Sequence, residues 1–185
     1  MNERDSEACA GALAARGFEI IDNENDADVI IFNTCSVRDQ AERKAVGKIG
    51  IMKRLKREKP DLIIGLMGCM AQNRGEELMA TIPHLDFTIG TGQLHRLTEI
   101  LEKFIEDRQR NIDVREGKEV LDGMGQHFPA LGYSVFAQIA VTRGCNRFCS
   151  YCIVPHVRGR EISREPKDII AEAEQLVANG AKEIM

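Results

Sequence analysis

Two short apolar runs, each followed by a helix-length amphipathic segment, constrain the fold of this chain most. The runs are DVIIFNTC (28–35) and DLIIGLMGC (61–69). Continuous apolar runs of this length are typical of parallel strands buried on both faces of a sheet, and such strands need a crossover helix between them. A third unit follows, in which DFTIGT (86–91) precedes the helix-like residues 93–107. The pattern predicts an α/β fold with an open parallel sheet.

The first two helices are predicted from the signals at their ends. Residues 4–17 read as an alanine-rich helix that Gly17 ends as a C-terminal cap. Ser36 and Asp39 have the spacing of a capping box, which predicts a helix from Ser36 to Lys59. No strand precedes the first helix, so we expect the start of this domain to be missing from the chain.

The pattern changes after residue 108. Residues 109–133 contain glycines, a proline and mixed charge, which predicts an interdomain linker. SVFAQIAVT (134–142) is then a strand candidate, residues 166–180 read as a helix ended by Gly180, and the chain stops at the expected start of another strand. We predict two domains, both cut short, and a linker: 1–108, lacking its first strand, 134–185, and 109–133 between them.

Composition and charge set the broad class. The 185 residues are 43% hydrophobic and 29% charged, with a net charge of -4, so the overall balance demands neither a membrane nor a nucleic-acid partner. No run approaches the roughly 18 apolar residues of a membrane span, and the acidic N-terminus is unlike a signal peptide. We expect a cytoplasmic, reducing location. The six cysteines then indicate metal binding or catalysis rather than disulfides.

Three cysteines stand within ten residues, RGCNRFCSYC (143–152). Cys145, Cys149 and Cys152 have C-x3-C-x2-C spacing. Three thiolates in a strand-to-helix loop can hold three irons of a 4Fe-4S cluster and leave the fourth iron open to a substrate or cofactor. The alternative fourth ligand is His156, which would complete a Cys3His zinc site in a structural or RNA-binding module.

Two further cysteines end the first two predicted strands. The carboxyl ends of neighbouring parallel strands face one crevice, so Cys35 and Cys69 are predicted to converge there. A helix start is predicted beside each, at Ser36 and near Asn73, where the helix dipole favours a thiolate. The alternative is that both cysteines are small buried hydrophobic residues. Cys9 lies on the alanine-rich helix and is predicted to pack in the core.

These motifs resemble a known family. The three-cysteine loop, with aromatic Tyr151 before its last cysteine, is similar to the signature of radical S-adenosylmethionine (SAM) enzymes. The continuation YCIVPHVRGREISRE is similar to the same stretch in the methylthiotransferases. NTCSVR and GCMAQ match that family's N-terminal domain, and the opening MN followed by DSE looks like the tail of its first motif. The serine, valine and arginine after Cys35 resemble the members that make 2-methylthio-N6-dimethylallyladenosine beside the tRNA anticodon.

The resemblance implies a fold and a set of cofactors. It implies a flavodoxin-like or Rossmann-like methylthiotransferase domain with an open parallel sheet, followed by the first βα unit of a radical SAM partial (β/α) barrel. The triplet Cys145, Cys149 and Cys152 would hold the radical-generating 4Fe-4S cluster, with SAM on its open iron and Tyr151 near the SAM. Cys35 and Cys69 would hold an auxiliary 4Fe-4S cluster that supplies sulfur; its third ligand has no match in this chain. A second SAM would supply the methyl group.

The resemblance also implies partners. They are the anticodon stem-loop of tRNA as substrate and an electron donor such as flavodoxin or ferredoxin; we expect a monomer, and a chain of this length to be inactive alone. Residues 38–59 hold nine basic side chains against three acidic ones, which favours an RNA partner or simply a solvated helix face. Arginines around the triplet are expected to bind RNA phosphates: Arg143, Arg147, Arg158, Arg160 and Arg164.

Two other functions stay open at this stage. One is a methylthiotransferase for another tRNA adenosine or for a ribosomal protein. The other is a non-enzymatic, zinc-dependent RNA-binding module that uses His156.

Overall fold

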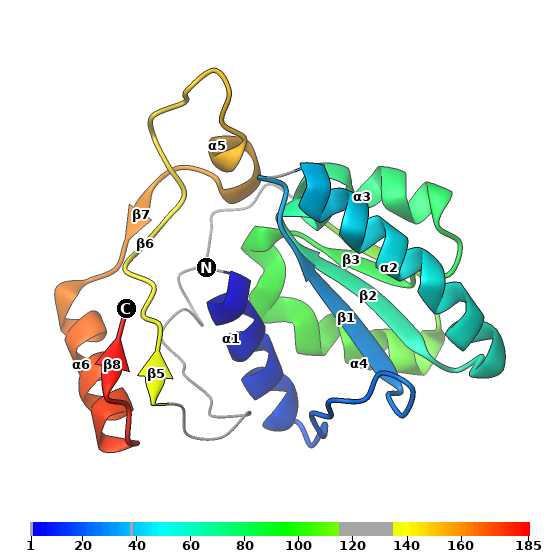
Figure 1. Ribbon diagram of the computed structural model, residues 1–185, viewed down its shortest axis with the longest axis horizontal. Coiled ribbons are helices and arrows are strands. Elements are labelled where there is room, and N and C mark those ends of the chain that lie inside the picture. Colours follow the sequence, from blue (N-terminus) through cyan, green and yellow to red (C-terminus); the bar gives the residue numbers. More distant parts are fainter. Residues whose placement is uncertain (1, 38, 115–134) are drawn as a thin grey trace.

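A parallel four-stranded sheet forms the main body of the protein. The computed structural model describes residues 2–37, 39–114 and 135–185 (Figure 1). The strands follow one another across the sheet in sequence order: β1 (Val29–Thr34), β2 (Ile63–Gly68), β3 (Phe87–Ile89) and β4 (Asn111–Asp113). Every neighbouring pair is parallel. The predicted α/β fold with an open parallel sheet is confirmed.

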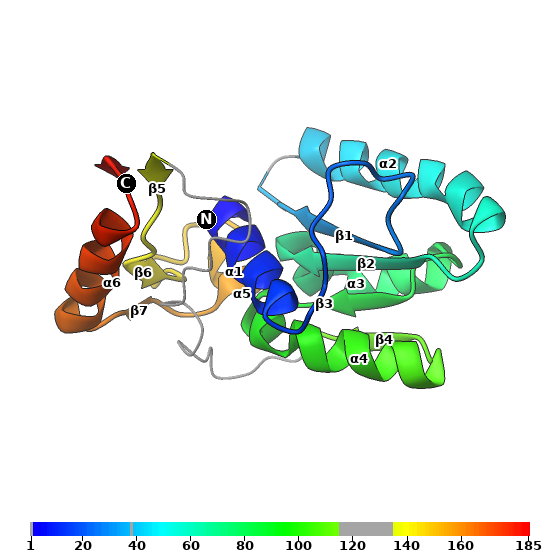
Figure 2. The same cartoon turned by 90° about the horizontal axis from the view of Figure 1, so that it is seen from below.

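Helices cover both faces of this sheet. On one face lie α2 (Asp39–Glu58) and α3 (Cys69–Thr81). On the other lie α1 (Asn2–Ala14) and α4 (Leu97–Asp107), which the 3-10 helix η1 (Thr91–Arg96) precedes. Figure 2 shows α2 and α4 on opposite sides of the strands. The result is a three-layer arrangement in which β2 is buried along its whole length.

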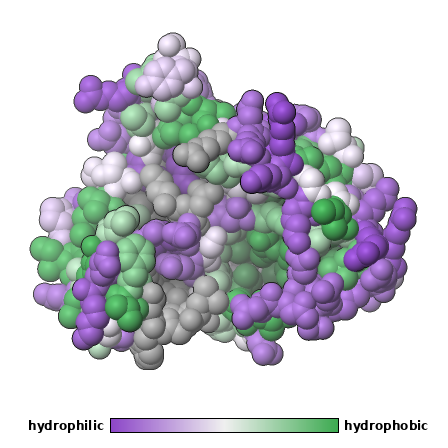
Figure 3. All heavy atoms as spheres, viewed as in Figure 1, coloured by the Kyte–Doolittle hydropathy of each residue, from purple (hydrophilic) through white to green (hydrophobic). Residues whose placement is uncertain are grey.

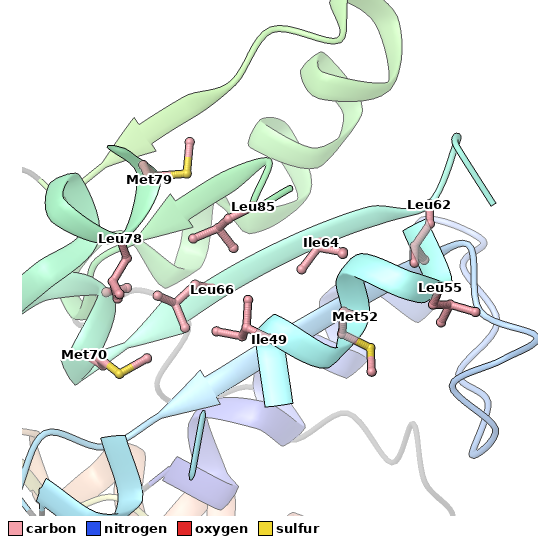
Figure 4. Close-up of a cluster of buried hydrophobic side chains, with 11 residues drawn as sticks. Ile49, Met52, Leu55, Leu62, Ile64, Leu66, Met70, Leu78, Met79 and Leu85 are labelled. Carbon is pink, nitrogen blue, oxygen red and sulfur yellow. The ribbon is translucent and has the colours of Figure 1, made fainter. Parts of the chain in front are cut away.

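The central strand β2 serves two hydrophobic cores. Ile64 packs toward α2 and α3, whereas its neighbour Ile63 packs toward α1 and α4, because successive side chains of a strand point to opposite faces. Figure 4 shows side chains of α2 meeting those of β2: Ile49, Met52, Ile64 and Leu66. A Cβ on Gly65 would lie 2.2 Å from Cζ of Phe87, so this glycine makes room for a fully buried ring.

Two predicted helix starts were wrong. Helix α2 begins at Asp39, and the hydroxyl of Ser36 is buried with no hydrogen-bond partner among the described residues, so the capping box is not formed. Helix α3 begins at Cys69 rather than near Asn73. The turn from β2 into α3 therefore has no loop, and Cys69 itself opens the helix.

The C-terminal segment adds two small strand pairs. In the first, β5 (Phe136–Ala137) pairs in parallel with β8 (Glu183–Ile184), and α6 (Pro166–Ala178) precedes β8, which confirms the strand expected at the end of the chain. In the second, β6 (Thr142–Arg143) pairs antiparallel with β7 (Ile162–Ser163), and α5 (Val154–Arg158) lies between them in sequence. Residues 134–142, predicted as one strand, thus contribute to two short ones.

Part of the predicted linker belongs to the sheet. Strand β4 lies within residues 109–133 and pairs with β3, and its last residue, Asp113, is buried. Residues 115–134 lie outside the described residues, so the domain division at 108 and 134 stays a prediction. None of the helices in the described ranges is long and apolar enough to cross a membrane.

Candidate functional site

The cysteine triplet occupies the loop between β6 and α5. This loop projects from the body of the molecule (Figure 1). All three cysteines are free thiols; Cys145 and Cys152 are half-buried and Cys149 is exposed. The Cys145 N–H donates to the carbonyl of Gly159 (3.2 Å), and the Cys152 N–H donates to the carbonyl of Cys149 (2.9 Å). A backbone bond therefore ties Cys145 to the residue after α5, and a turn within the triplet joins Cys152 to Cys149.

A glycine and a pair of rings set the path of the loop. Gly144 has φ of 75°, and a Cβ there would lie 2.1 Å from the carbonyl oxygen of Arg160, so only glycine fits. Phe148 also lies in the left-handed region, with φ of 46°. Its ring meets the His156 ring edge-on, with centroids 6.4 Å apart. His156 thus contacts the loop through an aromatic pair.

Cys35 and Cys69 follow the ends of neighbouring strands, as predicted. Thr34 and Gly68, the residues before them, are register partners in the β1–β2 pair. Gly68 has φ of 93°, and a Cβ there would lie 2.7 Å from the carbonyl oxygen of Thr34, so this glycine permits the sharp entry into α3. Cys35 is half-buried and its sulfur accepts the N–H of Val37 (3.4 Å), while Cys69 is 3% exposed.

The segment after the triplet packs on the same edge of the sheet. Helix α5 contacts α3 and η1. Arg158 of α5 donates through Nε to the Cys69 sulfur (3.2 Å) and through its terminal nitrogen to the Asp5 carboxylate (2.9 Å). The Thr91 hydroxyl donates to the carbonyl of Val157. The structure thus brings α5, which follows the triplet directly, against Cys69.

Burial separates the five arginines that were expected to bind RNA. Arg147 and Arg160 are exposed. The other three are buried: Arg143, Arg158 and Arg164. Buried guanidiniums that already bond protein atoms cannot reach a phosphate. Of the five arginines, only Arg147 and Arg160 are therefore candidates for an RNA contact.

The partners of the buried arginines come from several other elements. Arg143 donates to the carbonyl of Thr91 (2.7 Å), and Arg164 donates to the carbonyl of Ala140 (3.0 Å) and to the Glu172 carboxylate. Glu172 also accepts from Arg4 of α1 (3.2 Å). Sequence reasoning missed Asp5 and Glu172, because no local pattern in α1 or α6 marks a carboxylate that folding will bury beside an arginine.

Neighbouring groups stabilise the positive charge of Arg158. Burial opposes the charged form most strongly, yet the pKa of this guanidinium lies above its ordinary value because the Asp5 carboxylate and the Cys69 sulfur attract it and accept its hydrogen bonds. Arg158 is therefore a buried permanent cation in contact with a cysteine sulfur.

Cys9 behaves as a core residue, which confirms the sequence interpretation. It is buried in the cluster of α1 and α4, and that burial, with Asp5 nearby, raises the pKa of its thiol to about 12. An apolar cavity of about 320 Å³ lies beside it, and Figure 3 shows apolar residues set back between α1 and the loop before β1. The cavity is lined by residues of α1, β1, β2, α4 and that loop, and Cys9 is the one cysteine among the described residues of this lining.

The basic side chains of α2 form a solvated face. Arg43, Lys44 and Lys53 are exposed, and Lys48 pairs with Glu24 (2.6 Å). Arg38 lies outside the described residues. This face is consistent with the simpler of the two sequence interpretations.

The donor set of the triplet loop suits an iron-sulfur cluster chemically. Residues 144–153 offer three free thiols, one arginine and no carboxylate, and thiolates are the usual ligands of such clusters. Tyr151 is 90% exposed at the tip of this loop. Within residues 2–37, 39–114 and 135–185, no three His, Cys, Asp or Glu side chains are grouped as a metal site, so the ligand roles of both cysteine sets stay proposals.

Comparisons with known proteins match both halves of the chain. The model of the uncharacterized protein family UPF0004 matches residues 1–90, and the model of the radical SAM superfamily matches residues 139–185. These matches occur in the order that the sequence motifs predict.

Curated relatives match over the whole chain. The chain is 48% identical to the tRNA-2-methylthio-N(6)-dimethylallyladenosine synthase of Caldicellulosiruptor saccharolyticus and 46% identical to that of Carboxydothermus hydrogenoformans. The synthase of Clostridium perfringens is 43% identical. Each alignment covers 100% of this chain and 39%, 42% and 41% of the relative, respectively. The chain thus spans about two fifths of the length of these proteins.

Proposed function

Because the chain belongs to the radical SAM methylthiotransferase family, we propose that the protein adds a methylthio group to C2 of N6-dimethylallyladenosine in tRNA. The observation that supports this best is the packing of α5, which follows the triplet, against Cys69 at the carboxyl edge of the sheet. The contact between α5 and Cys69 supports the proposal that the triplet and Cys69 serve one active site.

The cysteines divide the ligand work between two clusters. When bound, SAM and the two 4Fe-4S clusters supply a 5'-deoxyadenosyl radical, the sulfur atom and the methyl group. Cys145, Cys149 and Cys152 would ligate the cluster that binds SAM. Cys35 and Cys69 would provide two thiolates to the auxiliary cluster. Tyr151, exposed beside Cys152, would lie near SAM.

Exposed arginines next to the triplet would position the RNA. Arg147 lies within the loop and Arg160 just after α5, and both are free to meet solvent. We infer that they contact phosphates of the anticodon stem-loop, because arginine pairs well with phosphate oxygens. We further propose a cytoplasmic monomer that receives electrons from a small carrier such as flavodoxin or ferredoxin.

The zinc alternative has less support. His156 would have to complete a site with the three cysteines, but its ring contacts Phe148. The match of residues 139–185 to the radical SAM superfamily favours the cluster.

The test is the nucleoside content of tRNA. The intact protein is expressed in cells that lack any other methylthiotransferase, and digested tRNA is analysed by liquid chromatography and mass spectrometry. We expect 2-methylthio-N6-dimethylallyladenosine with the wild type and its loss in Cys145→Ala. Cys9→Ala is the matched control and should retain it, because Cys9 is a core residue. A methylthio group on another adenosine or on a ribosomal protein would show that the substrate is different from the one proposed. The absence of a methylthio group from all of these molecules would contradict the proposal.

A further inference from the structure

One buried side chain joins three elements at the carboxyl edge of the sheet. Arg158 of α5 is 5% exposed and donates hydrogen bonds to Cys69 of α3 and to Asp5 of α1. The guanidinium fork can serve two partners at fixed angles, which a lysine ammonium cannot do with the same geometry. Arg158 therefore links the Cys69 sulfur to both α1 and α5.

The contact with sulfur is more than the core requires. A buried cation needs a carboxylate, and Asp5 supplies one. A neutral buried thiol gains little from an additional guanidinium, and Cys9 packs in the core as such a thiol. A thiolate or a metal-bound sulfur, in contrast, gains a charge-assisted hydrogen bond. The donor that faces Cys69 thus suits a cysteine that carries negative charge.

Arg164 provides the contrast within the same segment. It is also buried and paired with a carboxylate, that of Glu172, but its other hydrogen bonds go to the carbonyls of Ala140 and Asp168. Arg158 and Arg164 therefore share burial and ion pairing and differ in the sulfur contact. A variant of Arg164 therefore measures the effect of losing a buried, ion-paired arginine that does not contact a cysteine.

We propose that Arg158 is a positioning residue for the auxiliary cluster, holding Cys69 in place for ligation and raising the reduction potential of the cluster that Cys69 binds. The inference rests on the proposed function. Hydrogen bonds to cluster sulfurs and nearby positive charge stabilise the more negative, reduced state. Arg158 supplies both from one guanidinium.

The first test needs no cluster. Hydrogen exchange is measured by mass spectrometry in the metal-free protein for Arg158→Met, Arg158→Lys and Arg164→Met. We expect Arg158→Met to speed exchange at least tenfold in the second turns of α1 and α3, where the amides have intrahelical partners, Arg158→Lys to do so less, and Arg164→Met to leave the second turn of α3 unchanged. Unchanged exchange in strand β2 would show that the fold persists. Equal exchange around Cys69 in all variants overturns the positioning role.

The second test measures the potential. In the intact protein, Cys145, Cys149 and Cys152 are replaced by alanine so that only the auxiliary cluster remains, and a potentiometric titration is followed by electron paramagnetic resonance (EPR). Arg158→Met should shift the potential to a more negative value, Arg158→Lys should restore part of the shift, and Arg164→Met should match the parent. Equal potentials overturn the tuning role. A parent that binds no iron overturns the proposed function and the tuning together, while hydrogen exchange still decides whether Arg158 holds Cys69.

Discussion

Gly144→Ala is expected to disrupt the cysteine loop at its first turn. Gly144 precedes Cys145 and has φ of +75°. An added Cβ would lie 2.1 Å from the carbonyl oxygen of Arg160, 2.6 Å from its carbonyl carbon and 2.7 Å from the oxygen of Gly159. These are backbone atoms, so no side-chain rotation can relieve the contact. The strands β6 and β7 have to separate locally.

The cost has two parts that a control variant separates. A left-handed backbone costs an alanine about 1–2 kcal/mol. Forcing a methyl group into packed surroundings adds about 1–3 kcal/mol. Gly144→Ala should therefore cost about 2–5 kcal/mol, whereas Gly180→Ala should cost only about 1–2 kcal/mol, because Gly180 has φ of +100° but nothing within 4 Å of its added Cβ.

The assay is urea unfolding of both variants together with hydrogen exchange of the Cys145 amide, which donates to the carbonyl of Gly159. Gly144→Ala should lower the unfolding midpoint more than Gly180→Ala and should deprotect the Cys145 amide. Equal losses in the two variants, with the amide still protected, would refute the close contact with Arg160.

Three further changes test the core. Gly65→Ala should cost about 1–3 kcal/mol of stability in urea unfolding, because its Cβ meets the buried Phe87 ring. Adding Phe87→Leu in the same chain should recover part of that loss. If the stability losses of the two single variants simply add in the double variant, the two residues are not in contact. Burial raises the pKa of Cys9 from 9.0 to about 12, so the thiol loses its proton at lower pH in the unfolded state than in the folded state. The free energy of unfolding should therefore fall as the pH rises from about 9 to about 12. In Cys9→Ala, this fall of the free energy of unfolding with pH should be absent. Glu172→Ala leaves two buried guanidiniums without their carboxylate and should cost about 3–5 kcal/mol, and a loss under about 1 kcal/mol in thermal or urea unfolding would contradict their burial.

The sheet could be predicted because its strands carry a strong local signal. Residues 28–35 and 61–69 are continuous apolar runs, and they form β1 and β2 with Cys35 and Cys69 at equivalent ends. Strand β4 has no such signal, since Asn111–Asp113 contains one apolar residue and lies at the edge of the sheet. Edge strands of this length are fixed by their neighbour rather than by their own sequence.

The candidate site was predictable in its thiols and not in its cations. Cysteine spacing is written in the sequence, and it places the triplet in one loop. Arg158 and Arg164 read as surface charges, because no local pattern marks the carboxylates that pair with them: Asp5 of α1 is far from Arg158 in sequence, and Glu172 of α6 reaches Arg164 only through the packing of that helix. The start of α3 at Cys69 was missed for a related reason: a tight turn at Gly68 replaces the loop and the side-chain cap that usually precede a helix.

The proposed role of Cys145, Cys149 and Cys152 is to hold a SAM-binding cluster. The most direct measurement is EPR of the reduced, anaerobically reconstituted protein with and without SAM, compared with the Cys145→Ala/Cys149→Ala/Cys152→Ala variant. We expect a 4Fe-4S signal that SAM perturbs and that the variant lacks. A colourless protein that binds zinc, and loses the zinc when His156 is replaced by alanine, would contradict it.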